Sequence, residues 1–177
     1  MPFFDQSLET APRSQINFLQ LQKLKGMLEG IWERNKFYTT KMKEANLKPD
    51  DIRSLDDLRR LPLTTKHELV SDQLEHPPFG NNVTYDLKKY VRFHQTSGTT
   101  GSPFRVLDTE ESWDWWGQCW GHVLSGAGLS SEDRIFEAFS FGPFIGFWAS
   151  VEGARKIGAM MIPGGGRDSP QRLELMR

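Results

Sequence analysis

The sequence predicts an α/β fold in which a helical N-terminal region, residues 1–85, precedes a partial α/β domain, residues 86–177. Before residue 46, apolar residues recur at helical spacing. A loop rich in Pro, Gly and Asn follows over residues 76–82. After it, short apolar segments alternate with helical ones, which is typical of parallel strands joined by helices.

The N-terminal region is expected to be helical, with short helices after a long one. Ser14 is the expected cap of the long helix, and Gly26 and Gly30 weaken its middle, where a break is expected. Thr65 and Glu68 form a capping box at the start of a later helix. The predicted segments are a helix over 14–46, a turn over 47–51, a helix over 54–61 capped by Ser54, and a helix over 65–72.

The second half is expected to alternate strands and helices up to the end of the chain. Thr109 is the expected cap of its first helix, and Ser169 the cap of its last, with Pro170 at the first helical position. That last helix is expected to be still running at Arg177. The predicted strands cover 90–94, 104–107, 134–138 and 158–162, and the predicted helices cover 110–126, 144–156 and 169 onward.

Composition excludes some classes of function. Lys plus Arg number 22 against 23 Asp plus Glu, so no basic face for nucleic acid or anionic lipid is expected. No run approaches the roughly 18 apolar residues that a membrane span needs, and residues 1–14 lack a secretory core. The single cysteine, Cys119, fits a reducing, cytoplasmic setting and is expected to be buried and inert.

The most informative stretch covers residues 95–103, between two predicted strands. Gly98 and Gly101 allow backbone angles that other residues resist, so amides can approach an anion closely. Hydroxyls from Ser97, Thr99 and Thr100 add donors, and each hydrogen bond to a charged group contributes about 1.5–3 kcal/mol. No lysine follows Gly101, so this is not the common Gly-rich P-loop. On composition alone, an ordinary hairpin connection remains the alternative.

The stretch Thr96-Ser97-Gly98-Thr99-Thr100-Gly101-Ser102-Pro103 resembles the phosphate-loop signature of adenylate-forming enzymes. Residues 61–66, 139–144 and 158–166 are similar to segments that surround this loop in phenylacetate–CoA ligases. The resemblance covers nearly the whole chain, in one order. It implies the first strand–helix–strand units of that family's large domain, left incomplete. It also implies that the ATP phosphates bind at Thr96, Ser97, Gly98, Thr99, Thr100 and Gly101. The same resemblance implies an acyl pocket bordered by Phe139, Phe141, Gly142 and Phe144.

The resemblance implies an acid–thiol ligase that uses ATP, Mg²⁺ and coenzyme A to activate a small carboxylic acid, phenylacetate or a related aryl acid. Many members carry Lys beside the loop's proline, where this chain has Ser102 and Phe104. The Mg²⁺ ligand and the catalytic lysine of the family have no position here, so no catalytic residue is assigned. The isolated chain is therefore expected to be inactive.

Two other interpretations stay open. One is a non-catalytic nucleotide-binding or interaction module, and the other is a relative that adenylates another carboxylate, such as a deazaflavin cofactor derivative. A homodimer is an arrangement that the sequence leaves undecided. His94 precedes the loop and suits either a substrate contact or a structural hydrogen bond. The histidines show no metal-binding spacing. Trp113, Trp116 and Trp120 fit core packing better than a stacking platform.

Overall fold

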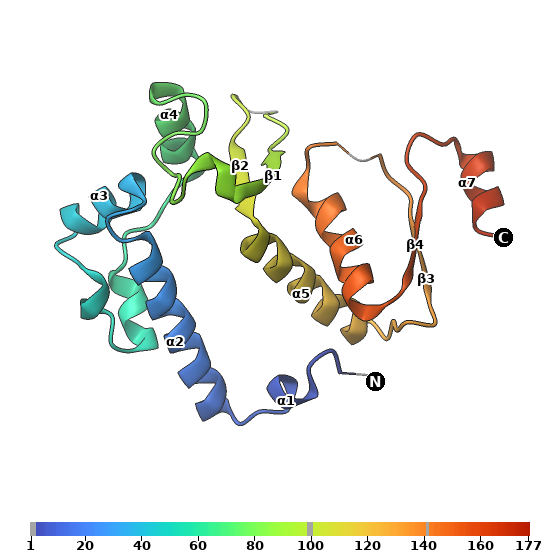
Figure 1. Ribbon diagram of the computed structural model, residues 1–177, viewed down its shortest axis with the longest axis horizontal. Coiled ribbons are helices and arrows are strands. Elements are labelled where there is room, and N and C mark those ends of the chain that lie inside the picture. Colours follow the sequence, from blue (N-terminus) through green and yellow to red (C-terminus); the bar gives the residue numbers. More distant parts are fainter. Residues whose placement is uncertain (1–2, 99–100, 141) are drawn as a thin grey trace. The chain divides into compact units, whose positions relative to one another are not determined.

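The computed structural model describes residues 3–98, 101–140 and 142–177. The chain folds as two compact units, one from residues up to Glu9 with 91–97 and 108–177, the other from 10–90 with 98–107. The predicted boundary after residue 85 stays a prediction. The elements in chain order (Figure 1) are α1 Gln6–Glu9, α2 Arg13–Ile31, α3 Lys36–Glu44, 3-10 helices Pro49–Asp51 and Leu55–Arg60, α4 Lys66–Glu75, 3-10 helix Leu87–Lys89, β1 Tyr90–Gln95, β2 Arg105–Thr109, α5 Glu110–Gly126, β3 Arg134–Glu137, α6 Ile145–Ile157, β4 Met160–Pro163 and α7 Ser169–Leu175.

The long N-terminal helix of the sequence prediction is two helices, α2 and α3. The break lies after Ile31 rather than at the glycines, and Glu33 within it has a φ of 61°. Asn35 then caps α3 by accepting a hydrogen bond from the Tyr38 amide at 3.0 Å. The α2 cap is Pro12, not Ser14 as predicted, because helical backbone already begins at Arg13.

Asn35 also explains why the chain turns at this point. Its side chain is buried, and its amide nitrogen donates to Asn82 Oδ1 at 3.0 Å and to Thr84 Oγ1 at 3.1 Å. A buried amide needs such partners, so this residue fixes both the helix start and a distant loop. The core beside the break is made by Leu28, Met42 and Ile52, with Leu24, Ile31, Trp32 and Leu61 against it.

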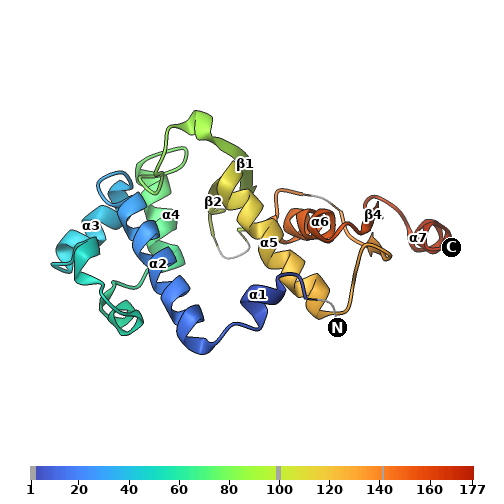
Figure 2. The ribbon, with the colours of Figure 1, turned by 60° about the horizontal axis from the view of Figure 1, so that its bottom comes forward.

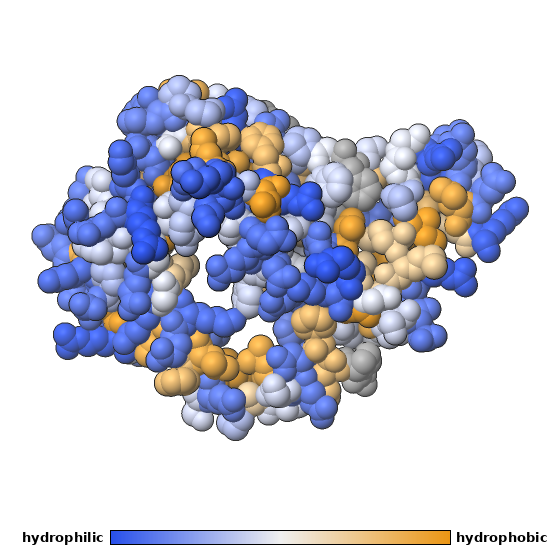
Figure 3. Space-filling view, in the orientation of Figure 1, coloured by the Kyte–Doolittle hydropathy of each residue, from blue (hydrophilic) through white to orange (hydrophobic). Residues whose placement is uncertain are grey.

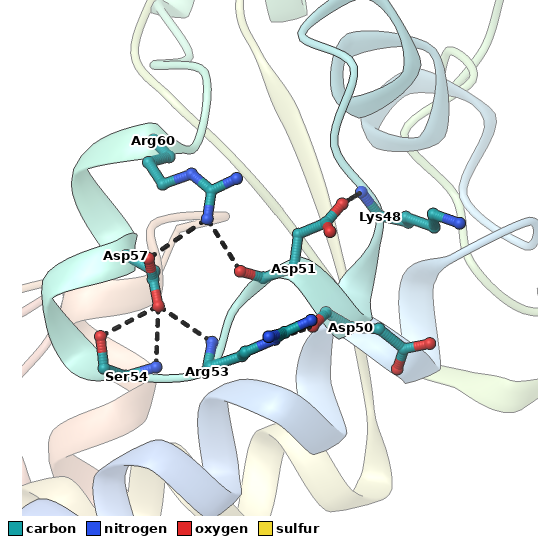
Figure 4. Close-up of polar contacts among 7 residues, drawn as sticks. All are labelled: Lys48, Asp50, Asp51, Arg53, Ser54, Asp57 and Arg60. Atoms are coloured by element: carbon teal, nitrogen blue, oxygen red, sulfur yellow. Dashed lines mark hydrogen bonds and ion pairs between the residues drawn. The ribbon is translucent and has the colours of Figure 1, made fainter.

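The short helix at 54–61 is confirmed as the 3-10 helix Leu55–Arg60, and its cap is shown in Figure 4. The Asp57 carboxylate accepts from the Arg53 amide at 3.0 Å and from the amide and hydroxyl of Ser54, both at 2.9 Å. The Arg60 guanidinium donates to the same carboxylate at 3.2 Å. The Arg53 amide, followed by Ser54 and Arg60, lowers the pKa of Asp57 to about 2.

The parallel strand pairing predicted for the second half is confirmed for β3 and β4. They pair in register from Arg134 opposite Met160 to Glu137 opposite Pro163, with α6 in the connection between them. Strands β1 and β2 form a separate two-stranded sheet. Thr109 caps α5 as predicted, accepting from the Ser112 amide at 3.2 Å.

Helices α5 and α6 pack side by side in both views (Figures 1 and 2). Glycines make the close approach, because a Cβ on Gly153 would lie 2.4 Å from Trp120 Cβ, and one on Gly117 would lie 3.2 Å from Glu152 Cβ. Trp113 is 4% exposed and fits the predicted core, whereas Trp116 is 39% exposed, because α6 covers only one face of α5. Cys119 is half-buried rather than fully buried.

The last helix differs from its prediction at both ends. Asp168, one residue before Ser169, is the cap and accepts from the Gln171 amide at 2.9 Å. The helix ends at Leu175 instead of continuing to Arg177. Figure 3 shows apolar surface near β4 and α7, where Met160 and Leu173 are exposed. Within the described residues, no helix has the length and apolar character needed to cross a bilayer.

Candidate functional site

The loop predicted to bind phosphate begins directly after β1. Thr96 and Ser97 follow Gln95, the last residue of β1, and Ser97 is exposed. In the second unit, Gly98 has a φ of 68° and Gly101 a φ of 147°, the region that favours glycine. Both glycines are therefore required by the backbone, as predicted. Thr99 and Thr100 lie outside the described residues.

The downstream half of the loop is closed on itself. The Gly101 amide donates to the Gly98 carbonyl at 2.9 Å, and a Cβ on Gly98 would lie 2.9 Å from Pro103 Cγ. One amide predicted to face an anion is thus used inside the turn. Gly101 and Ser102 are exposed, so this side of the turn is open to solvent.

A buried His–Asp pair lies at the base of the strands that lead to and from the loop. His94 Nδ1 is 3.4 Å from Asp108 Oδ2, and the two residues are 4% and 5% exposed. The His94 ring stacks on Trp113 at 5.1 Å between centroids. Burial lowers the pKa of His94, opposed by the charge of Asp108. This enclosed position favours the structural interpretation of His94 over a substrate contact.

The segment predicted to border the acyl pocket, residues 139–144, is joined to the end of β1 by one backbone hydrogen bond. The Gln95 amide donates to the Pro143 carbonyl at 2.8 Å. In the same segment, the Gly142 carbonyl accepts from Trp148 Nε1 at 2.8 Å, and a Cβ on Gly142 would lie 3.3 Å from the Phe144 ring. Phe144 is 38% exposed, and its predicted place at the acyl pocket stays a prediction. Phe141 lies outside the described residues.

The turns beyond β3 and β4 also meet. The Gly164 amide donates to the Glu137 carbonyl at 2.8 Å, and the Gly166 amide to Ser140 Oγ at 3.4 Å. A Cβ on Gly165 would lie 2.8 Å from the Phe139 carbonyl oxygen. The Phe139 segment and the Gly-rich turn therefore lie together at the carboxyl ends of two parallel strands, where α/β proteins bind ligands.

A buried carboxyl beneath these turns was not singled out from the sequence. Glu137, the last residue of β3, is 4% exposed and accepts a hydrogen bond from the Ser150 hydroxyl of α6. Its Oε2 has no hydrogen-bond partner among the described residues. Burial raises the pKa of Glu137, and the Ser150 hydroxyl opposes this. The only sequence signal was a charged residue in an apolar strand.

We expect Glu137→Gln to stabilise the protein increasingly as pH rises. The pKa of Glu137 in the folded protein lies above its value near 4.5 in the unfolded chain. The unfolding free energy of the wild type therefore falls as pH rises from the unfolded-state pKa to the folded-state pKa. The glutamine does not ionise and avoids this loss. Chemical denaturation of both proteins from pH 4 to pH 8 measures the difference in unfolding free energy. A difference that is flat with pH contradicts the assignment.

Within the described ranges, no three His, Cys, Asp or Glu side chains are grouped to hold a metal ion. Arg105, two residues after the loop's Pro103, donates through its guanidinium to the Pro78 carbonyl at 3.0 Å.

The curated relatives and the solved structures similar to this chain are both CoA ligases of carboxylic acids. No family model matches the chain. A phenylacetate-coenzyme A ligase of Escherichia coli is 35% identical over 170 residues, 96% of this chain, and one of Thermus thermophilus is 30% identical over 174 residues, 98% of this chain. The chain is a homologue of the phenylacetate–CoA ligases. It spans 38% of the length of these two relatives.

The solved structures similar to this chain include another CoA ligase. A crystal structure of 2-hydroxyisobutyryl-CoA ligase with 2-HIB-AMP and CoA matches 92% of this chain with a TM-score of 0.84 at 29% identity. The match covers 34% of that ligase. A second structure of the ligase, with 2-HIB-AMP in the postadenylation state, gives a TM-score of 0.83 at 27% identity. The predicted fold class, the N-terminal portion of an adenylate-forming ligase, is confirmed.

Proposed function

We propose that this chain is the N-terminal portion of an ATP-dependent carboxylic acid–CoA ligase that acts through an acyl-adenylate. The observation that carries the proposal is the bond from the Gln95 amide to the Pro143 carbonyl. It joins the strand entering the glycine loop to the segment predicted to border the acid. An adenylating enzyme needs ATP and the acid next to each other, because the rate of their reaction depends on proximity and orientation.

In this reaction a carboxylate oxygen of the acid attacks the α-phosphorus of ATP, and the bond to pyrophosphate breaks. The thiol of coenzyme A then attacks the carbonyl carbon of the acyl-adenylate, and AMP leaves. The loop from Thr96 to Gly101 would support the first step by donating hydrogen bonds to the phosphates as charge builds on pyrophosphate, with the Gly101 amide excepted because it is bonded inside the turn. The 2-HIB-AMP and CoA complexes of the similar ligase support both steps.

We infer an aryl acid such as phenylacetate as the substrate. The Phe139 carbonyl lies against Gly165 of the Gly-rich turn, and the Phe144 ring lies against Gly142. Aromatic rings offer a large apolar surface with a preferred geometry for another ring. The relatives named phenylacetate-coenzyme A ligase support this choice. Mg²⁺ is expected to accompany ATP, as the resemblance to adenylate-forming enzymes implies.

The full-length ligase that carries this segment is expected to exchange labelled pyrophosphate into ATP only when phenylacetate is present, and to form a thioester when coenzyme A is added. 2-Hydroxyisobutyrate serves as the aliphatic comparison and is expected to support at least about tenfold less exchange, about 1.4 kcal/mol. Absence of exchange with every acid contradicts the proposal. Tight calorimetric binding of ATP to the 177-residue chain, without thioester in the full-length protein, favours a nucleotide-binding module.

A further inference from the structure

One side chain of the helical region binds both backbone groups of the residue that starts β2. Gln73 Nε2 donates to the Arg105 carbonyl at 2.6 Å, and the Arg105 amide donates to Gln73 Oε1 at 3.0 Å. Gln73 lies in α4 and is 9% exposed. Its amide thus makes the pair of bonds that a neighbouring strand would otherwise supply.

The position of this contact along the chain connects it to the glycine loop. Arg105 comes two residues after Pro103, the residue against which Gly98 closes the turn. Gly98 to Arg105 and Gln73 belong to the same compact unit. Two bonds to one planar amide fix the direction of the strand as well as its position. The downstream half of the loop therefore starts from a backbone that α4 holds in place.

Helix α4 is itself held at both ends. At its start, Glu68 accepts from the Thr65 amide at 2.6 Å and from the Lys41 ammonium of α3. Lys41, followed by the Thr65 amide, lowers the pKa of Glu68 to about 2, so the carboxylate is charged near neutral pH. Near its end, Asp72 accepts from the Asn81 amide at 2.7 Å. Gln73 therefore projects from a fixed helix.

The geometry points to Gln73 as a positioning residue, which holds the downstream half of the phosphate loop in the conformation that binds ATP. This inference rests on the proposed function, because it assumes that the loop binds ATP. It gives the helical N-terminal region a part in nucleotide binding, through one buried amide. A merely structural role would change the amount of folded protein but leave the affinity of the folded protein for ATP unchanged.

The test compares Gln73→Met with wild type in the full-length ligase. Methionine keeps the length of the side chain and removes both hydrogen bonds. We expect KM for ATP in pyrophosphate exchange to rise about tenfold, equivalent to about 1.4 kcal/mol, with KM for the acid unchanged. Leu74→Met introduces the same residue at the next position, which is 66% exposed, and is expected to leave both constants unchanged.

Amide hydrogen exchange gives a second readout that does not depend on activity. In Gln73→Met, residues 101–107 are expected to exchange faster, while α2 and α5 keep wild-type rates. A KM for ATP within twofold of wild type, or wild-type exchange rates over 101–107, overturns the inference. Failure of wild type itself to exchange pyrophosphate with any acid overturns the proposed function instead, and the hydrogen-exchange arm then still tests the contact between Gln73 and Arg105.

Discussion

Replacing Gly98 with valine is expected to abolish acid-dependent pyrophosphate exchange in the full-length ligase. The φ of 68° at this position is strained for any residue with a Cβ, and most of all for a β-branched one. The added Cβ would also lie 2.9 Å from both Pro103 Cγ and the Gly101 carbonyl oxygen. The turn therefore has to open, and misplacement of about 1 Å costs about 100-fold in rate.

Gly128→Val is the matched control, because Gly128 also has a positive φ, 91°, but lies after α5 with no heavy atom within 4 Å of an added Cβ. It imposes similar backbone strain away from the loop. Pyrophosphate exchange per folded molecule is therefore expected to stay near the wild-type rate. Exchange retained in Gly98→Val, measured on protein shown to be folded by circular dichroism, refutes the assignment of the loop to ATP.

Gly153→Val is expected to have the largest effect on stability. An added Cβ would overlap Trp120 Cβ at 2.4 Å and the Trp120 backbone carbonyl carbon at 3.0 Å. Backbone is hard to displace, so α5 and α6 have to separate. Overpacking costs typically about 1–3 kcal/mol and occasionally more, and we expect the upper end or beyond. Urea denaturation followed by tryptophan fluorescence measures the loss.

Gly146→Ala in the same helix is the control for this change. A Cβ there meets no heavy atom within 4 Å, and alanine favours a helix over glycine by about 0.8–1.0 kcal/mol. The control is therefore expected to raise the unfolding free energy slightly. If Gly153→Val unfolds at the wild-type urea concentration, the two helices do not pack through this glycine.

The type of nearly every major element could be predicted from the sequence, because local signals decide it. Thr65 and Thr109 cap their helices as predicted, since a cap needs only its own side chain and an amide three residues on. The break before Asn35 could not be placed, because it depends on bonds to Asn82 and Thr84, 47 and 49 residues away.

The candidate site also contains residues that the sequence predicts and residues that depend on distant contacts. The glycines of the loop were predictable, because a small-residue turn between strands has a recognisable pattern. The role of Gln73 was not, since its partner is 32 residues away and a glutamine in a helix ordinarily faces solvent. Glu137 was missed for a related reason, because only the packing of α6 shows that its carboxyl is enclosed.

The link between Gln95 and Pro143 uses main-chain atoms alone. Under the proposed function, substitutions at Phe139 or Phe144 would change which acid is accepted without breaking this link. Replacement of Gln95 by proline would remove the link, because proline lacks the N–H that donates to the Pro143 carbonyl. Under the proposed function, diversification of the acid site would leave the connection to the nucleotide loop in place.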